Sequence, residues 1–225
     1  MKTKNIFVAC DVSSQKEIID LLKLIHEDIS GIKIGLQYIT QRSPEEIREL
    51  SKYKKPIFYD GKFFDIKNTL VESVKSLKHL NVNYATVHLL NGLDALKAAN
   101  QAAKEINLKL LGVSILTSFS DEDLESLGFN NSVEDQVKKL IKIALEAKLH
   151  GIICSPLEIK MIKEIASDLK CFTPGIRMKN SKDDQKRTMS AKEAIKEGSD
   201  CLIIGRPITK GNAKENLKNI LSSID

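Results

Sequence analysis

The sequence predicts an α/β protein of the (β/α)8 TIM-barrel type with a single domain. Short runs of apolar and β-branched residues alternate with longer amphipathic segments, and eight such runs occur in 225 residues. This alternation is typical of parallel strands that are connected by helices. Each unit has about 28 residues, slightly fewer than in the barrels of ~250 residues that are usual for this fold. We therefore expect one catalytic barrel domain over residues 1–225.

Eight runs are expected to form the strands, because each is rich in β-branched or large apolar residues. They cover residues 5–11, 31–37, 56–62, 83–89, 108–116, 151–155, 170–174 and 200–205. An open, doubly wound sheet is the alternative with the same order of elements. It is disfavoured because no G-x-G-x-x-G motif follows the first strand and no Walker-type loop follows any strand.

The segments between the strands begin with signals that are typical of helix N-termini. In five of them a serine precedes an acidic residue by three positions, the spacing of a capping box. These pairs are Ser14/Glu17, Ser43/Glu46, Ser132/Asp135, Ser155/Glu158 and Ser190/Glu193. Pro44 and Pro156 occupy the first helical position, which proline favours. Apolar residues then recur at helical spacing, so each helix is expected to pack one face on the sheet.

Composition argues against several classes of protein. No apolar run approaches the roughly 20 residues that cross a bilayer, and the N-terminal run ends at Asp11 without a signal-peptide cleavage pattern. The four cysteines are isolated, which favours buried reduced thiols over disulfides or a zinc site. The net charge of +5 is spread over helix-like segments, with no basic block that indicates nucleic-acid binding. We expect a cytoplasmic protein without membrane or nucleic-acid partners.

Charged residues lie inside or directly after several predicted strands. These residues are Asp11, Lys33, Asp60 and Lys62. Burying any one of them alone would be costly, so each must pair with an opposite charge, meet water or meet a ligand. In a (β/α)8 barrel the carboxyl ends of the strands form the active site, so we assign these four residues to it.

The segment from residue 59 to 69 is the most informative part of the chain. Asp60 and Lys62 are two positions apart on a predicted strand, so they are expected to face the same side. Asp65 opens the following helix, where the helix dipole favours a carboxylate. A structural ion pair with Asp65 as a helix cap is the alternative. Together with Lys33, however, these residues carry more charge than packing requires.

Two loops near the end of the sequence predict an anion-binding site. The motif T-P-G-I-R follows the seventh predicted strand, and I-G-R-P-I follows the eighth. Loops at these two places often bind phosphate in such barrels. Backbone N–H groups are accessible at Gly175 and Gly205, and Arg177 and Arg206 supply positive charge. Ordinary turns with surface arginines are the alternative for either loop taken alone.

With these residues assembled, the sequence resembles the orotidine 5′-phosphate decarboxylase family. The resemblance is carried by D-x-K-x-x-D-I-x-x-T (60–69), L-T-S (116–118), T-P-G-I-R (173–177), D-D-Q-x-R (183–187) and G-R-x-I (205–208), with V-A-C-D ending at Asp11 and I-K-I-G around Lys33. The first motif is shared with a wider superfamily of sugar-phosphate decarboxylases and aldolase-like synthases. The resemblance is narrowed, within this superfamily, to the decarboxylase that acts on a nucleotide by the L-T-S, T-P-G-I-R and D-D-Q-x-R motifs.

The resemblance implies decarboxylation of orotidine 5′-monophosphate to UMP, the last step of de novo pyrimidine biosynthesis, without a metal or organic cofactor. It implies that Lys62 is the general acid toward C6 of the pyrimidine and that Asp60 lies against the departing carboxylate. Lys33 and Asp65 would keep Lys62 charged and aligned. The implied substrate contacts are Asp11 and Lys33 at the ribose, Thr117 and Ser118 at the pyrimidine edge, Gln185 between base and phosphate, and Gly205 with Arg206 at the phosphate, while Arg177 supports the loop above it.

The resemblance also implies a homodimer with shared active sites, because in the family Asp65, Ile66 and Thr69 reach the site from the partner subunit. Two alternatives stay open at this point. A related sugar-phosphate decarboxylase or hexulose-phosphate synthase would need a divalent metal and would lack the L-T-S and D-D-Q-x-R motifs. A non-catalytic phosphate-binding barrel would have no need for the charged residues at 33, 60, 62 and 65.

The sequence departs from the family pattern at two places. Lys67 stands where the family usually has proline, so the start of the following helix is expected to be less rigid. The residues after His88 replace a small, glycine-rich turn with Leu-Leu-Asn-Gly. We expect His88 to have a supporting or core role rather than a catalytic one.

Overall fold

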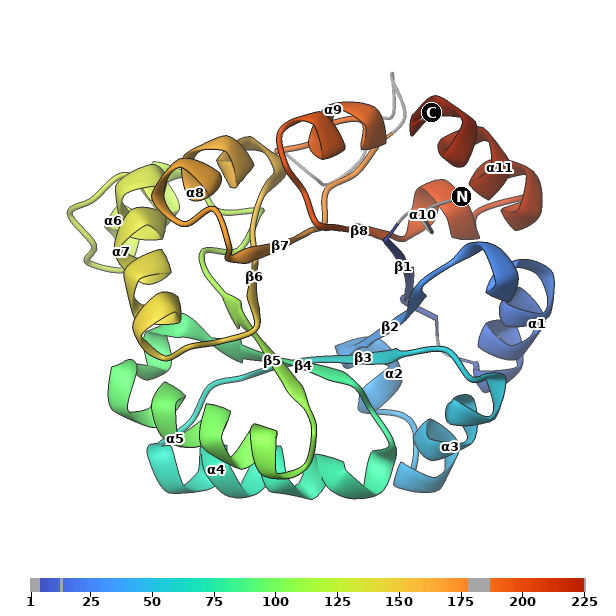
Figure 1. Cartoon of the computed structure of the whole chain (residues 1–225), viewed down its shortest axis with the longest axis horizontal. Helices are drawn as coiled ribbons and strands as arrows, with labels where there is room; N and C mark the ends of the chain where they lie inside the picture. The colour runs from blue at the N-terminus through green and yellow to red at the C-terminus, as the bar shows by residue number, and fades with distance from the viewer. Residues whose placement is uncertain (1–4, 13, 178–186, 225) are drawn as a thin grey trace.

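The eight strands pair in parallel in chain order and close into a barrel, with β8 beside β1 (Figure 1). The computed structural model describes residues 5–12, 14–177 and 187–224. The strands are β1 (Ile6–Cys10), β2 (Gly31–Gly35), β3 (Ile57–Phe63), β4 (Tyr84–His88), β5 (Lys109–Val113), β6 (Gly151–Ile153), β7 (Lys170–Thr173) and β8 (Cys201–Ile204). The predicted barrel is confirmed, and the open-sheet alternative is wrong.

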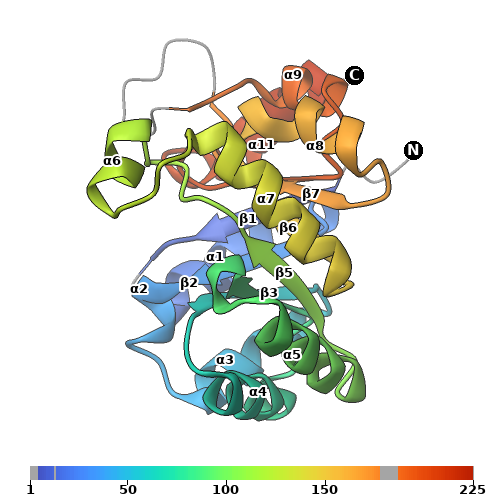
Figure 2. The ribbon, with the colours of Figure 1, turned by 90° about the vertical axis from the view of Figure 1, so that its left-hand side faces the viewer.

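Helices surround the barrel, and α5, α7 and α8 cover the side of the sheet that faces the viewer in Figure 2. The α-helices are α1 (Gln15–Ile25), α2 (Leu36–Ile39), α3 (Pro44–Glu49), α4 (Lys67–Ser76), α5 (Leu93–Glu105), α6 (Asp121–Ser126), α7 (Val133–Glu146), α8 (Ile159–Ile165), α9 (Ala191–Lys196), α10 (Arg206–Thr209) and α11 (Ala213–Ile224). Short 3-10 helices are η1 (His26–Asp28), η2 (Leu50–Tyr53), η3 (Leu77–Leu80), η4 (Leu89–Asn91) and η5 (Pro156–Glu158). In the described residues no helix has the length and apolar character to cross a bilayer.

Most of the predicted helix caps are confirmed, and one is wrong. Ser14 is the N-cap residue of α1, but its side chain makes no capping hydrogen bond. Ser132 accepts from the amide of Asp135, which caps α7. A further capping box joins Ser120 and Asp123 at the start of α6, although the sequence analysis did not predict it. Complete capping boxes form at Ser43/Glu46, Ser155/Glu158 and Ser190/Glu193.

Aromatic rings fill the interior of the barrel. Phe7, Phe58, Tyr84 and Phe172 come from four different strands, and their ring centroids lie 5.4 to 6.4 Å apart. A larger apolar core lies between the outside of the sheet and the surrounding helices. Because the rings occupy the space between the strands, the interior is a packed core, and a ligand has room only beyond it.

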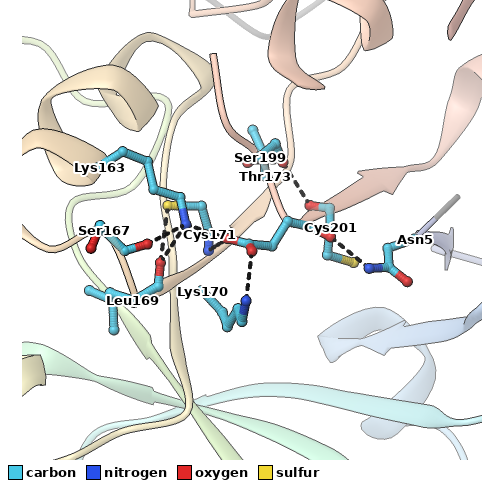
Figure 3. Close-up of polar contacts among 10 residues, drawn as sticks. Asn5, Lys163, Ser167, Leu169, Lys170, Cys171, Thr173, Ser199 and Cys201 are labelled. Atoms are coloured by element: carbon cyan, nitrogen blue, oxygen red, sulfur yellow. Dashed lines mark hydrogen bonds and ion pairs between the residues drawn. The ribbon is translucent and has the colours of Figure 1, made fainter. Parts of the chain in front are cut away.

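Asp200, which precedes β8, holds the amino end of the barrel together, and its partners Asn5, Lys163, Lys170 and Cys171 are labelled in Figure 3. Its carboxylate accepts from Lys163 Nζ at 2.6 Å, from Lys170 Nζ at 3.0 Å and from the amide of Cys171 at 2.8 Å. Its carbonyl accepts from Asn5 at 3.0 Å, so one residue connects α8, β7 and the segment before β1. The four cysteines are free and buried, as predicted.

We expect Asp200→Asn to lower the free energy of unfolding by about 2 kcal/mol at pH 7, because it weakens charge-assisted hydrogen bonds in a half-buried site. Burial opposes ionisation of Asp200, but the hydrogen bonds from Lys163, Cys171 and Lys170 outweigh it and hold the pKa below its usual value of 3.8. The stabilisation is therefore complete above pH 3.8 and disappears as the pH falls through the lower pKa of the folded state. Urea unfolding of both proteins at several pH values measures this. A difference that does not shrink in acid would contradict the prediction.

Candidate active site

A cavity of about 670 Å³ opens at the carboxyl end of the barrel, beyond the aromatic rings. Phe58, Ala9 and Ile153 supply apolar contact surface in it. Of the residues predicted from the sequence, those that line the cavity are Asp11, Lys33, Asp60, Lys62, Thr117, Gly175, Arg177, Gly205 and Arg206. These residues come from segments far apart in the sequence, and the closure of the sheet brings them to one end.

Four of these side chains form an alternating chain of charges. Lys33 Nζ lies 3.0 Å from Asp11 Oδ1 and 3.4 Å from Asp60 Oδ2. Lys62 Nζ lies 2.9 Å from the same oxygen of Asp60. The order is therefore Asp11, Lys33, Asp60, Lys62, and each inner charge has an opposite charge on both sides. We call these four residues the charge network.

The two inner members of the charge network are almost removed from water. Lys33 and Asp60 are each 8% exposed. Burial alone would lower the pKa of Lys33, but Asp60 and Asp11 outweigh it and hold that pKa above its usual value. Burial also opposes ionisation of Asp60, yet Lys33 and Lys62 hold its pKa below the usual value. Both groups are therefore charged at neutral pH.

Asp60 and Lys62 meet for a different reason from the one predicted. The regular pleat of a strand is interrupted here, because the register between β3 and β4 shifts between Tyr59 and Phe63. Lys62 has a φ of 47°, in the left-handed region that side chains other than glycine rarely adopt. This irregularity, and not alternation along a flat strand, brings the Lys62 ammonium back to the Asp60 carboxylate.

Thr86 on β4 supports this irregular backbone and was missed in the sequence analysis. Its hydroxyl accepts from the amide of Lys62 at 2.8 Å and donates to Asp60 Oδ1 at 3.0 Å. One buried hydroxyl thereby satisfies both the bulged backbone and the free oxygen of the carboxylate. A polar residue at the centre of an apolar strand was the available signal.

A glycine leaves room for the first ion pair of the charge network. A Cβ atom on Gly35 would lie 2.9 Å from Asp11 Oδ1 and 3.1 Å from Lys33 Nζ. Any larger residue would push these two groups apart. The close approach explains why β2 ends in glycine.

Three predicted site residues do not line the cavity of this chain. Asp65, Ile66 and Thr69 are exposed around the start of α4, and Ile66 is 74% exposed. The expectation that Asp65 opens the helix is wrong by two positions. Helix α4 begins at Lys67 with Ile66 as its N-cap residue, and Asp65 precedes that cap. Its carboxylate instead accepts from the Ile66 amide at 2.7 Å, while its own amide donates to Asn91 Oδ1 at 3.0 Å.

Two more predicted residues lie apart from the cavity or outside the description. Ser118 is exposed and does not line the cavity, although the adjacent Thr117 does. Gln185 lies outside the described residues.

His88 is half-buried and accepts from the Leu90 amide at 3.4 Å. Burial and nearby Lys62 lower the pKa of His88, so it is neutral at pH 7.

The structure compensates for the unusual residue at position 67. Lys67 Nζ lies 2.8 Å from Asp94 Oδ2, which ties the first turn of α4 to the first turn of α5. Asn91 adds a second link, because its amide donates to the carbonyls of Phe63 and His88. The expected loss of rigidity at Lys67 is therefore opposed by contacts that the sequence analysis did not anticipate.

The loops after β7 and β8 face the same cavity. The backbone of Arg177 donates to Met189 at 2.9 Å, and the Met189 amide donates to Gly175 at 3.2 Å. Gly175 has a φ of 78°, which favours glycine at this position. Gly205 and Arg206 follow β8 and line the same cavity. Among the described residues, no group of three or more His, Cys, Asp or Glu side chains is arranged to hold a metal ion.

Arg187 and Glu158 form a contact at the cavity wall that the sequence did not predict. The guanidinium of Arg187 donates to the carbonyls of Leu116 and Thr117 and pairs with the carboxylate of Glu158. The resemblance included Arg187 in a motif without giving it a role. The spacing S-x-x-E identified Glu158 only as part of a helix cap.

Comparison with known proteins gives consistent results. A family described as "Orotidine 5'-phosphate decarboxylase / HUMPS family" matches residues 4–220. A protein named orotidine 5′-phosphate decarboxylase from Wolbachia sp. subsp. Brugia malayi is 40% identical over 217 residues, with 96% of each chain covered. One of the same name from Idiomarina loihiensis is 36% identical, with 100% of this chain and 99% of the other covered. The crystal structure of orotidine 5′-phosphate decarboxylase from Lactobacillus acidophilus has a TM-score of 0.86 at 29% identity, with 99% of both chains covered.

We expect Thr86→Val to lower the free energy of unfolding by about 1–2 kcal/mol, because it leaves the Lys62 amide and one Asp60 oxygen without their partner. Thr40→Val is the matched control, since the Thr40 hydroxyl is exposed and bonds only its own helix at Leu36. That control should change the free energy by less than about 0.5 kcal/mol. Urea unfolding monitored by circular dichroism measures both. Equal effects of the two substitutions would show that Thr86 does not support the charge network.

Proposed function

The chain belongs to the orotidine 5′-phosphate decarboxylase / HUMPS family, and we propose that it decarboxylates orotidine 5′-monophosphate to UMP with Lys62 as the general acid. The activity is that of a carboxy-lyase in pyrimidine biosynthesis. The observation that supports the proposed mechanism most strongly is the charge network. Its buried carboxylate, Asp60, pairs with both Lys33 and Lys62 and so holds the Lys62 ammonium in the cavity.

The reaction needs a cation and a proton at one place. When the bond between C6 and the carboxylate breaks, the electron pair stays on C6 and carbon dioxide leaves. No ketone or imine of the substrate absorbs this charge. Lys62 stabilises the carbanion-like state electrostatically and then transfers a proton from Nζ to C6, and water reprotonates the amine. Because the ammonium is already oriented by Asp60 at 2.9 Å, it need not reorganise during the reaction.

The remaining cavity residues each bind a different part of the substrate. Asp11 and Lys33 bind the ribose, and Thr117 with Ser118 binds the pyrimidine edge. Gly205 and Arg206 bind the phosphate, Gln185 lies between base and phosphate, and Arg177 supports the loop above the phosphate. The phosphate lies far from C6, so its binding energy can hold the base against the charge network. The shared cavity of Thr117, Arg206 and Lys62 supports this arrangement.

The active form is a homodimer in which Asp65, Ile66 and Thr69 complete the site of the partner subunit. Exposed apolar side chains around the start of α4 support this proposal. Phe64 is 64% exposed and Ile66 is 74% exposed, directly after the strand that carries Lys62. Apolar groups of this size on a surface often mark an interface.

The protein works in the cytoplasm and binds neither nucleic acid nor membranes. Four free, buried cysteines support a reducing compartment. The net charge of +5 has no basic block with interleaved aromatics, which supports a small-molecule substrate.

We expect Lys62→Ala to lower kcat for orotidine 5′-monophosphate at least ~1000-fold, because it removes both the cation and the proton donor. Lys16→Ala, at an exposed position on α1, is the control and should keep full activity. Loss of orotidylate absorbance measures the rate. Excess EDTA should leave the native rate unchanged, and inhibition by EDTA would instead favour the metal-dependent relatives of the family. Retained turnover in Lys62→Ala would exclude Lys62 as the general acid.

Shared sites predict complementation between inactive subunits. Lys62→Ala and Asp65→Ala should each be nearly inactive alone. In a mixed dimer one site receives both altered residues, and the other site is intact. After random mixing and reassociation the activity should therefore recover to about a quarter of the native value. No recovery, with heterodimers demonstrated by mass spectrometry, would place Asp65 and Lys62 in the site of the same chain.

A further inference from the structure

Arg187 makes a partly buried three-way contact behind one wall of the cavity. Its Nε donates to the Thr117 carbonyl at 3.2 Å, and one terminal nitrogen donates to the Leu116 carbonyl at 3.1 Å. The other terminal nitrogen lies 2.5 Å from Glu158 Oε1. Arg187 and Glu158 have side chains that are 17% and 5% exposed. This is the fork geometry in which a guanidinium holds several acceptors at once.

The contact joins three of the loops at the mouth of the barrel. Leu116 and Thr117 follow β5, Glu158 lies in η5 after β6, and Arg187 lies between β7 and α9 in the sequence. Glu158 is itself held by the Ser155 amide at 2.9 Å, so the carboxylate belongs to a fixed cap. Burial raises the pKa of Glu158, and the neighbouring Arg187 opposes that rise. A buried pair of this kind is strongly destabilising when one partner is removed alone.

The acceptors of Arg187 belong to the cavity wall. Leu116 and Thr117 both line the cavity, together with Gly175. A Cβ atom on Gly175 would lie 2.9 Å from the Arg187 carbonyl, so this part of the wall also packs directly against Arg187. The position of these residues therefore depends on a group that does not itself line the cavity.

We propose that Arg187 and Glu158 are positioning residues that hold the Leu116–Thr117 wall against the pyrimidine of the substrate. The inference rests on the proposed function, which places the pyrimidine edge at Thr117. The phosphate group is bound on another side, at Gly205 and Arg206 after β8, whereas Leu116 and Thr117 follow β5. Loss of the guanidinium should therefore weaken binding of the base and leave binding of the phosphate intact.

Two ligands that differ only in the base test this separation. UMP and ribose 5-phosphate share the sugar and the phosphate, and only UMP has a pyrimidine. Isothermal titration should give a Kd for UMP about 10-fold higher in Arg187→Met than in the native protein, with the Kd for ribose 5-phosphate unchanged within about 2-fold. The KM for orotidine 5′-monophosphate should rise in parallel with the Kd for UMP.

Two variants and one control keep the test independent of folding. Arg187→Lys keeps a charge beside Glu158 but cannot hold both carbonyls, so it should fold and show the same selective loss of UMP binding. Glu158→Gln should show it more weakly, because the guanidinium keeps its carbonyl acceptors. Asp200→Asn breaks contacts of similar burial at the opposite end of the barrel, so it should lower stability without changing either Kd.

The outcomes separate the inference from the proposed function. Unchanged UMP binding in Arg187→Lys, or equal losses for UMP and ribose 5-phosphate, would overturn the positioning role. A selective loss in Asp200→Asn would also overturn it, because general destabilisation would then explain the effect. If the native protein neither binds UMP nor consumes orotidine 5′-monophosphate, the proposed function itself fails. If the native protein consumes orotidine 5′-monophosphate but the variants lose UMP and ribose 5-phosphate binding equally, only the inference is refuted.

Discussion

The buried pair of Lys33 and Asp60 is the constraint on which the rest of the site depends. Neither charge is stable in this position alone, because removing one partner would leave the other without compensation in a place with little water. The two outer groups, Asp11 and Lys62, complete the compensation. Much of the local structure follows from this need. Gly35 leaves space for the first pair, and Thr86 satisfies the remaining oxygen of Asp60.

The two ends of the barrel place buried charge for different purposes. At the amino end, Asp200 is surrounded by donors and connects elements that have no contact with the cavity. At the carboxyl end, Lys62 is only partly enclosed and its ammonium faces the cavity. The aromatic rings of Phe7, Phe58 and Phe172 separate the two regions. Stability and chemistry therefore occupy opposite ends of one sheet, as is general for this fold.

The loops at the carboxyl end are ordered by contacts between them as well as by the strands that precede them. Arg187 and Glu158 connect three loops, and Lys67 with Asp94 connects the starts of α4 and α5. The second contact shows how a departure from the family pattern is tolerated. Lysine cannot restrict the backbone as proline does, but its ammonium finds a carboxylate on the neighbouring helix. The effect of Lys67 on the start of α4 therefore has to be judged together with its partner Asp94.

The sequence by itself determined the barrel, the number and approximate bounds of its strands, and most of the residues at its mouth. Periodicity and chain order carry this information, because each strand and helix reflects local alternation, and parallel closure brings all carboxyl ends to one side. Only the tertiary structure decided how the charges meet. The left-handed backbone of Lys62 brings its ammonium to Asp60 on the same strand, the Thr86 hydroxyl joins β4 to β3, and Arg187 joins the loops after β5 and β6. The local sequence pattern does not predict these contacts, because they arise from strand register, burial and the packing of loops.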